Sequence, residues 1–312
     1  MTRVLALALN PAVDVEWTVS GVGWDEKNTI EAERRWAGGK GVNVARWLRA
    51  AGVDAELLLL MGGAYGRELG RHLRSEGLPF RSFQVGQETR VDYIVTTPAG
   101  RQLRFNPRGP EILREERLAL FERIDRRLPR RGIVVMSGSL PRGLPATAYA
   151  QLAGRVRERG GIALVDSDGP VFAAAVKAHP FLLKPNEHEL RQWAGGGVRT
   201  EPALRGAAEE LSAATGGWVL LTRGARPAWL IHHDEDRRWT AAPPPVRIQN
   251  SVGAGDAVMA SVAAQIARGS GPAEWLRWGM AAGAVAARSP GGHAPSWPEV
   301  VQLAGRICVA GG

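Results

Sequence analysis

The sequence predicts an α/β protein built on a mostly parallel, doubly wound sheet that carries a small β-sheet lid. Two observations lead to this prediction. Short apolar runs alternate with helix-like stretches along the 312 residues, and two other segments show strand-like alternation with little helical period. Alternating strands and helices are typical of parallel sheets, whose ligands bind at the carboxyl ends of the strands. The two exceptional segments, residues 13–36 and 89–107, are expected to pair as the lid.

Six apolar runs predict the strands of the main sheet, at residues 4–9, 55–61, 133–137, 162–166, 181–184 and 218–222. The first run resembles the core of a signal peptide, but Asn10, Pro11 and Asp14 follow it without a small-residue cleavage site. We therefore interpret this run as a buried strand. Helices are expected between the strands, at residues 41–51, 67–76, 146–159, 201–215 and 256–268.

The composition predicts one soluble, cytoplasmic domain over residues 1–312. The chain is 45% hydrophobic and 23% charged, and no apolar run reaches the roughly 18 to 20 residues of a membrane span. The single cysteine, Cys308, excludes an internal disulfide framework and suits a reducing compartment. We therefore expect neither a membrane partner nor a disulfide scaffold.

The net charge of +9 raises the question of nucleic acid binding, because a basic surface attracts polyanions. The arginines are scattered, however. Their densest group, residues 114–131, alternates with glutamates in a helical pattern that is typical of a solvated helix face. We therefore expect small phosphorylated ligands rather than nucleic acid.

The most informative motif is Gly253-Ala254-Gly255-Asp256, which places a carboxylate at the start of an apolar helix. Two glycines allow a tight turn with outward N–H groups, and the helix terminus adds partial positive charge, so an anion is expected there. A carboxylate beside an anion hole is useful if it accepts a proton from an attacking hydroxyl. Asp256 is therefore the candidate general base of a phosphoryl transfer. The structural alternative for Asp256 is a plain helix N-cap.

Polar clusters also follow other predicted strands, at residues 10–14, 38–46, 137–141 and 184–190. Each has a structural alternative, because turns and helix starts have a similar composition. In the last cluster, Asn186 and Glu189 stand three residues apart, where both can face one Mg²⁺ ion or its waters. The same pair also matches a capping box.

Together these clusters resemble the ribokinase-like carbohydrate kinases of the PfkB family, over nearly the whole chain. Residues 250–256 are similar to the C-terminal signature of that family, and residues 37–46 to its N-terminal signature. Residues 10–14, 89–92 and 137–141 resemble the branch that phosphorylates sugar phosphates, as does the run Lys-Pro-Asn-Glu-His-Glu-Leu. The resemblance implies a three-layer α/β/α sandwich and ATP- and Mg²⁺-dependent phosphorylation of fructose 1-phosphate, fructose 6-phosphate or tagatose 6-phosphate.

The resemblance also implies roles for single residues. Asp256 would be the base, and the anion hole would be formed by Gly253, Ala254 and Gly255. The sugar would contact Asp14, Gly38, Gly39, Lys40 and Asn43, and its existing phosphate would contact Lys27, Arg90, Arg104 and Ser139. The ATP site would comprise Lys184, Asn186, Thr222, Gly224 and Ser251. Mg²⁺ would be held, through water, by Asn186 and Glu189.

Three positions depart from the family pattern. Asp92 stands where the family usually has Asn, and its carboxylate would repel a substrate phosphate unless it pairs with a neighbouring cation. Pro227 lies in residues 224–228, which resemble the nucleotide loop of the family, and a proline there has no backbone N–H to donate. Arg108 is either a further phosphate ligand or a surface residue.

Other functions stay open. The fold also suits a kinase of a free sugar or nucleoside, or a non-catalytic sugar-phosphate sensor, which Pro227 would favour. Residues 62–66 suggest a dehydrogenase, but they lack the G-x-G-x-x-G spacing, and the chain has no P-loop signature. Open edges of the lid strands favour a homodimer through the lid.

Overall fold

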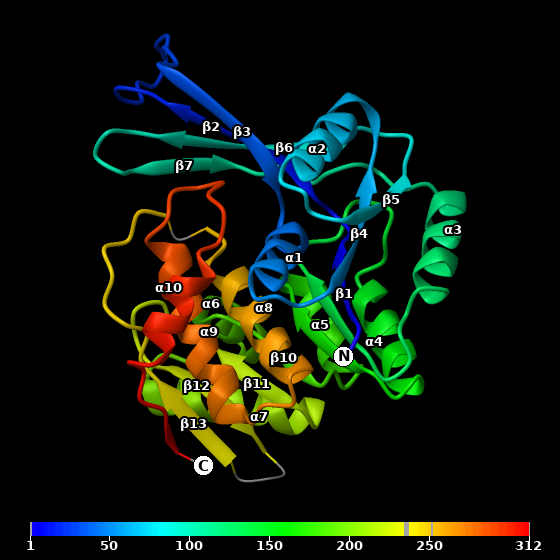
Figure 1. Ribbon diagram of the computed structural model, residues 1–312, viewed down its shortest axis with the longest axis vertical. Coiled ribbons are helices and arrows are strands. Elements are labelled where there is room, and N and C mark those ends of the chain that lie inside the picture. Colours follow the sequence, from blue (N-terminus) through cyan, green and yellow to red (C-terminus); the bar gives the residue numbers. More distant parts are fainter. Residues whose placement is uncertain (1, 234–236, 251, 312) are drawn as a thin grey trace.

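The computed structural model describes residues 2–233, 237–250 and 252–311. In this part of the chain, ten strands form the main sheet and four strands form a separate small sheet. Helices cover both faces of the main sheet, and the small sheet projects from its upper end in Figure 1. The fold is therefore a three-layer α/β/α sandwich with a small β sheet, which confirms the predicted class.

The main sheet is parallel over most of its width. Its strands are β1 (Val4–Ala8), β4 (Ala55–Met61), β5 (Phe80–Gln84), β8 (Ile133–Ser137), β9 (Ile162–Asp166), β10 (Leu182–Leu183), β11 (Trp218–Leu221), β12 (Ala228–His232), β13 (Arg237–Ala241) and β14 (Ala310–Gly311). Their order is β14-β13-β12-β11-β10-β9-β8-β1-β4-β5, and β12, β13 and β14 pair antiparallel at one edge. The six strands expected from apolar runs are all present.

Four strands of the main sheet were not predicted. The edge strand β5, Phe-Arg-Ser-Phe-Gln, is only partly buried, and β13 carries polar residues beside its buried positions. These two strands therefore lack the continuous apolar run of a central parallel strand. β12, Ala-Trp-Leu-Ile-His, is apolar and buried on both faces, but it was not predicted. β14 is the exception to local pairing, because its partner β13 lies far before it in the sequence, whereas β12 and β13 form a hairpin.

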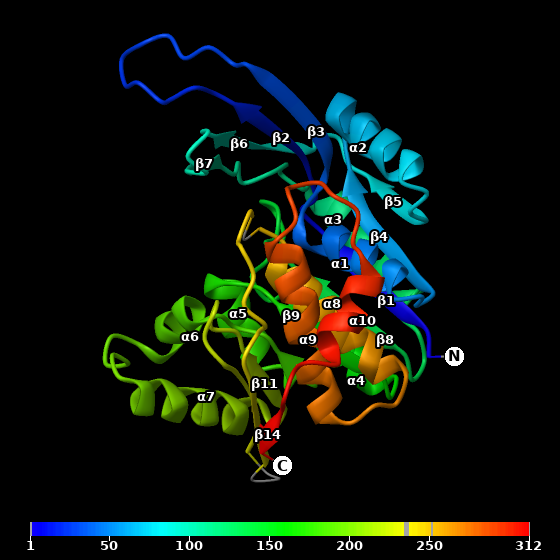
Figure 2. The ribbon, with the colours of Figure 1, turned by 60° about the vertical axis from the view of Figure 1, so that its left-hand side comes forward.

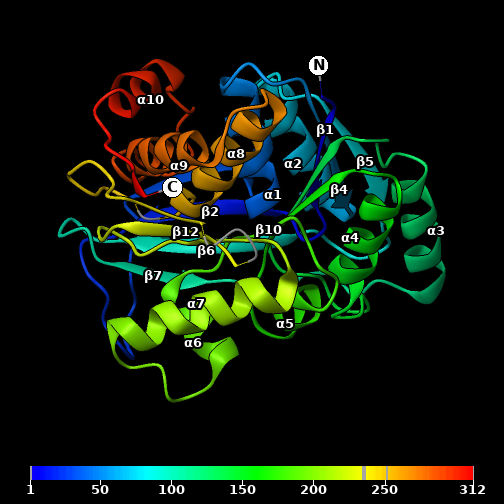
Figure 3. The same ribbon diagram turned by 90° about the horizontal axis from the view of Figure 1, so that it is seen from below.

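The core consists of two apolar layers, one on each face of the sheet. Alternate side chains of β1 point to opposite faces, so Val4 and Ala6 belong to one layer while Leu5 and Leu7 belong to the other. Figure 3 shows the sheet between the two groups of helices. One face is covered by α1 (Lys40–Ala50), α2 (Gly63–Ser75), α8 (Ala254–Ala267), α9 (Pro272–Ala287) and α10 (Trp297–Ala304). The other is covered by α3 (Arg114–Asp125), α4 (Ala148–Glu158), α5 (Gly169–Val176), α6 (Glu187–Ala194) and α7 (Glu201–Thr215).

The small sheet, here called the lid, has the strand order β3-β2-β6-β7. Its strands β2 (Ala12–Thr18), β3 (Ala32–Gly38), β6 (Arg90–Thr96) and β7 (Gln102–Phe105) overlap both segments that interrupt the helical rhythm of the sequence. The central pair β2 and β6 is parallel, with Asp14 opposite Asp92. Figure 2 shows the β2–β3 hairpin extending away from the rest of the molecule.

The arginine-rich stretch that raised the question of nucleic acid forms α3, which buries Leu120 and Ile124 and exposes most of its charged residues. This is the solvated helix face that its charge pattern indicates. None of the helices in the described residues is long and apolar enough to cross a bilayer.

Candidate active site

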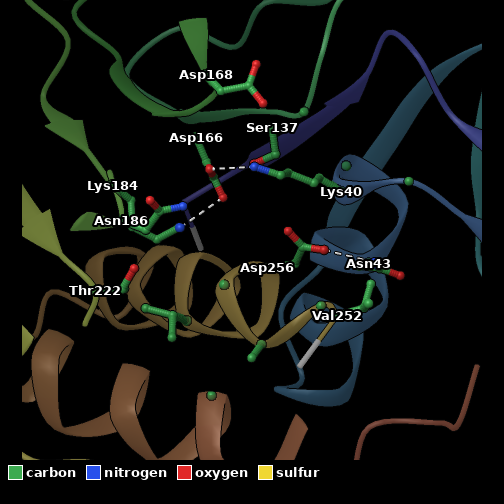
Figure 4. A pocket seen from close by; sticks show the side chains of 18 of the residues that line it. Lys40, Asn43, Ser137, Asp166, Asp168, Lys184, Asn186, Thr222, Val252 and Asp256 are labelled. Carbon is green, nitrogen blue, oxygen red and sulfur yellow. Dashed lines mark hydrogen bonds and ion pairs between the residues drawn. The ribbon is translucent and has the colours of Figure 1, made fainter. Parts of the chain in front are cut away.

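A cavity of about 1200 Å³ lies between the lid and the carboxyl ends of the parallel strands. Residues following β1, β8, β9 and β10 line it, together with the first turns of α1 and α8 (Figure 4). Such pockets typically measure roughly 300 to 1,000 Å³ for one drug-sized ligand, so this cavity has room for two small ligands.

Asp256 lies in the first turn of α8, in the wall of this cavity. The helix begins after Gly253, whose φ of 81° is a left-handed conformation that favours glycine. Asp256 is only 4% exposed, and Asn43 Nδ2 donates a hydrogen bond to its Oδ2 at 2.8 Å. Burial raises the pKa of Asp256 to about 6, although Lys40 and Asn43 act in the opposite direction. A carboxylate that ionises near neutral pH at a helix N-terminus is suited to accept a proton.

Two lysines reach toward the same helix terminus, and one buried carboxylate holds both (Figure 4). Lys40 Nζ lies 3.0 Å from Asp166 Oδ1, and Lys184 Nζ lies 3.1 Å from Asp166 Oδ2. Burial would raise the pKa of Asp166, but Lys184 and Lys40 outweigh this effect and hold it below its usual range. A Cβ added to Gly255 would lie 3.2 Å from Lys184 Nζ, so the turn passes close to this cation.

The sequence interpretation did not assign a role to Asp166, which is 1% exposed and ends β9. The sequence did contain a signal for this role, because Asp166 ends an otherwise apolar strand. A carboxylate buried in that position needs cations as partners. Asp168, two residues further on, also lines the cavity and was not predicted.

At the lid end of the cavity, Asp14 and Asp92 lie opposite each other on β2 and β6. Burial and the charge of Asp92 raise the pKa of Asp14 to about 7. Asp92 Oδ2 lies 3.2 Å from Arg90 Nη2 and accepts a hydrogen bond from Asn106 Nδ2 at 3.2 Å. Arg90 is therefore the neighbouring cation with which Asp92 pairs, and this pairing reduces the repulsion between Asp92 and a substrate phosphate. A Cβ on Gly38 would lie 2.0 Å from Asp14 Oδ1, so the absence of a side chain at position 38 leaves room for the Asp14 carboxylate. Gly38 itself does not line the cavity.

Most of the expected substrate residues share the cavity. Ser139 Oγ accepts a hydrogen bond from Asn10 Nδ2 at 3.0 Å, which fixes the loop after β8 against the end of β1. Lys27 is exposed in the β2–β3 connection and does not line the cavity of its own chain. The predicted residues that do line it at this end are Asp14, Gly39, Lys40, Asn43, Arg90, Arg104 and Ser139.

At the opposite end, Asn186 and Glu189 form a reciprocal capping box at the start of α6. Asn186 N donates to Glu189 Oε2 at 2.8 Å, and Glu189 N donates to Asn186 Oδ1 at 2.9 Å. The capping box, which was the structural alternative to a metal site at this pair, is therefore present. Lys184, Thr222 and Gly224 also line the cavity, whereas Ser251 lies outside the described residues.

The residues at this end fit a Mg²⁺ ion bound through water. Over the described ranges, no group of three or more His, Cys, Asp or Glu side chains is arranged to hold a metal. Glu189 nevertheless lines the cavity, and the capping hydrogen bond uses its Oε2, which leaves Oε1 for a further donor such as a metal-bound water. Mg²⁺ prefers oxygen ligands and usually keeps several waters, so a site with few protein ligands suits it.

A buried arginine, which was not predicted, connects the segments around the nucleotide loop. Arg223 has a side chain only 2% exposed, and its Nε donates to Glu187 Oε1 at 2.8 Å. Its Nη2 lies 3.2 Å from Glu201 Oε2, and its guanidinium stacks 4.0 Å from the Trp229 ring centroid. Pro227 does not line the cavity, and its carbonyl accepts a hydrogen bond from Arg223 Nη1.

Comparisons with known proteins agree with one another. The model of the family described as pfkB family carbohydrate kinase matches residues 8–299. The 1-phosphofructokinase of Rhodobacter capsulatus is 33% identical to this chain over 312 residues, which cover 98% of the chain and 97% of that protein. The ATP-dependent 6-phosphofructokinase isozyme 2 of Mycobacterium tuberculosis H37Rv is 31% identical over 291 residues, or 93% and 85%.

The fold comparison points the same way. The crystal structure of phosphofructokinase-2 from Escherichia coli in complex with potassium superposes with a TM-score of 0.92 at 28% identity, covering 98% of this chain and 99% of that one. A structure of Arabidopsis thaliana ribokinase with ribose and ATP superposes with a TM-score of 0.76 at 20% identity, which supports the fold alone.

Proposed function

The chain belongs to the pfkB family of carbohydrate kinases, and we infer that it transfers the γ-phosphoryl group of ATP to a hydroxyl of a ketohexose phosphate. Fructose 1-phosphate or fructose 6-phosphate is the proposed acceptor, and tagatose 6-phosphate belongs to the same class. The observation that carries this proposal is Asp256, a buried carboxylate at a helix N-terminus, in the wall of one cavity that has a cationic lid end and a nucleotide-loop end.

In the proposed reaction, the acceptor hydroxyl lies beside Asp256 and loses its proton to Asp256 while the phosphoryl group is transferred in line. The free N–H groups at the start of α8 favour the negative charge that develops on the phosphoryl oxygens. Lys184 and Lys40, positioned by Asp166, add positive charge on the same side of the cavity. A bound Mg²⁺ would neutralise further phosphate charge, with Asn186 and Glu189 holding its waters.

The sugar and its phosphate are proposed to bind at the lid end. Asp14 and Asn43 are hydrogen-bonding groups suited to sugar hydroxyls, and Arg104 and Ser139 are suited to phosphate oxygens. A kinase of a free sugar or nucleoside is less well supported, because arginines would not be needed at that end. The sensor alternative also loses support, because Pro227, the residue that favoured it, does not line the cavity.

We propose a cytoplasmic homodimer that pairs through the lid. The β2–β3 hairpin exposes Trp24 to 81%, with Val22 and Ile30 nearby in the sequence, and Phe105 on the edge strand β7 is 56% exposed. Exposed apolar side chains and an open sheet edge are both typical of an interaction surface. Lys27 lies on the same hairpin, so lid pairing would change its surroundings.

A coupled assay of ADP release with Mg·ATP tests the function. The panel comprises the three ketohexose phosphates, free fructose, free ribose and a nucleoside, with ATP alone as the blank. We expect ADP release that depends on a phosphorylated ketohexose, and product analysis should give the bisphosphate. Release with free sugars or nucleosides only would contradict the proposal.

A further inference from the structure

We infer that Arg108 and Arg142 bind the phosphate group that the sugar substrate already carries. Their positive charge takes the place of the charge of Arg90, which Asp92 neutralises in the lid. This inference rests on the proposed function and identifies two further specificity residues for it. It follows from the contacts of Arg90, from the position of the two arginines, and from the charge balance of the cavity.

The guanidinium of Arg90 is largely occupied by the protein itself. Its Nε donates to the Asn10 carbonyl at 3.2 Å, its Nη1 donates to the Pro107 carbonyl at 3.2 Å, and its Nη2 lies 3.2 Å from Asp92 Oδ2. Its side chain is only 10% exposed. Of the five N–H groups of an arginine, two remain for a ligand, and the positive charge is already paired. Arg90 can therefore offer a phosphate only part of its fork, and it also holds the segment that carries Arg108.

Arg108 and Arg142 stand on two loops that are joined around Asn10 and that both line the cavity. The carbonyl of Arg108 accepts a hydrogen bond from Asn10 Nδ2 at 3.2 Å, and the same Nδ2 donates to Ser139 Oγ. Arg142 Nε donates to the Gly109 carbonyl at 3.4 Å, which joins the second loop to the first. The two arginines therefore have defined backbone positions beside Ser139, which is a proposed phosphate contact.

The charge balance indicates what these arginines bind. A sugar phosphate brings close to two negative charges at neutral pH. Of the described lid residues that line the cavity, Arg104 is the one cation without a carboxylate partner, because Arg90 pairs with Asp92. Arg142 lies 3.9 Å from the half-exposed Glu111, a distance too long for a hydrogen bond, and no carboxylate in the described residues pairs with Arg108. Arginine binds phosphate oxygens through its planar fork, so these two side chains match a phosphate dianion.

Steady-state kinetics of Arg108→Ala, Arg142→Ala and the double variant test this inference. Because a hydrogen bond to a charged group contributes about one factor of ten in binding, each single change should raise KM for the sugar phosphate about tenfold and leave KM for Mg·ATP within about twofold. Arg101→Ala is the matched control, because Arg101 is an exposed lid arginine that does not line the cavity. We expect it to change neither KM.

Asp92→Asn provides a readout that a merely structural role would not produce. Removing this carboxylate frees the charge of Arg90, so KM for the sugar phosphate should fall, and Arg108→Ala should raise that KM by a smaller factor in the Asp92→Asn variant than in the wild type. A double variant of Arg108 and Arg142 whose KM for the sugar phosphate stays within about twofold of wild type would overturn the inference, as would an equal rise in KM for Mg·ATP.

Calorimetry with inorganic phosphate separates this inference from the proposed function. If the wild-type enzyme turned over no phosphorylated sugar, the proposed function would fail, but the binding of phosphate could still be measured without ATP. Weaker phosphate binding by the double variant, with Arg101→Ala unchanged, supports the two-arginine site. Equal phosphate binding by the wild type and the double variant refutes it.

Discussion

Replacing Asp256 by Asn is expected to lower turnover by roughly 10²- to 10⁴-fold while the fold stays intact, because the change removes a general base. The amide has the size of the carboxylate, and its oxygen can still accept the hydrogen bond of Asn43, whose Nδ2 lies 2.8 Å from Asp256 Oδ2. Each factor of ten corresponds to about 1.36 kcal/mol, so the expected loss of transition-state stabilisation is roughly 2.7 to 5.4 kcal/mol.

The titration of Asp256 gives an independent test of the same role. Burial raises its pKa from 3.8 to about 6, and only the ionised form can accept a proton. As the pH falls through about 6, kcat/KM should therefore begin to decrease, approaching about tenfold per pH unit. Asn43 donates a hydrogen bond that favours the ionised carboxylate, so Asn43→Ala should move this acid limb to higher pH.

The assay is the initial rate of ADP release at saturating Mg·ATP over a series of sugar phosphate concentrations, which gives both kcat and kcat/KM, measured over about pH 5 to 9 for the wild type and both variants. Circular dichroism and thermal unfolding first establish that each variant is folded. Near-normal turnover by Asp256→Asn would refute the assignment of the base. An acid limb that does not move in Asn43→Ala would show that a different group controls it.

Three further predictions concern other parts of the molecule. Gly38→Ala should raise KM for the sugar phosphate by at least tenfold, because the new Cβ would lie 2.0 Å from Asp14 Oδ1 and displace it; substrate kinetics measure this. Asp166→Asn should lower the free energy of unfolding by roughly 3 to 5 kcal/mol at pH 7, because Lys184 would stay buried without its carboxylate; urea denaturation measures this. Trp24→Asp should weaken self-association through the lid, as measured by sedimentation at several protein concentrations.

Each of these predictions has a control or a contrary outcome. Gly154→Ala adds the same methyl group in α4, where nothing lies within 4 Å, and should leave KM unchanged. An unchanged KM in Gly38→Ala would mean that Asp14 does not hold the sugar. Stability of Asp166→Asn equal to wild type would mean that the lysines do not depend on Asp166. A Trp24→Asp variant that associates as strongly as wild type would exclude the hairpin from the interface.

Local patterns made the central strands and most of the helices predictable, whereas α5, α9 and α10 were not expected. A strand buried on both faces needs a continuous apolar run, as in β1 and β8, and such a run can be read directly from the sequence. The edge strand β5 and the next-to-edge strand β13 escaped prediction because their partners, not their own composition, make them strands. The lid could be anticipated since its alternating segments did not fit the helical rhythm around them.

The sequence by itself predicted the α/β class and the candidate base Asp256. The second prediction was possible because the glycines and the apolar helix of this motif are adjacent in the chain. The tertiary structure alone decided how the charges pair. Asp166 lies between Lys40 and Lys184, and Arg90 pairs with Asp92, through contacts between strands and loops that are far apart in the chain. Electrostatic energy depends on distance in space and on burial, and neither quantity is set by sequence spacing across a folded sheet.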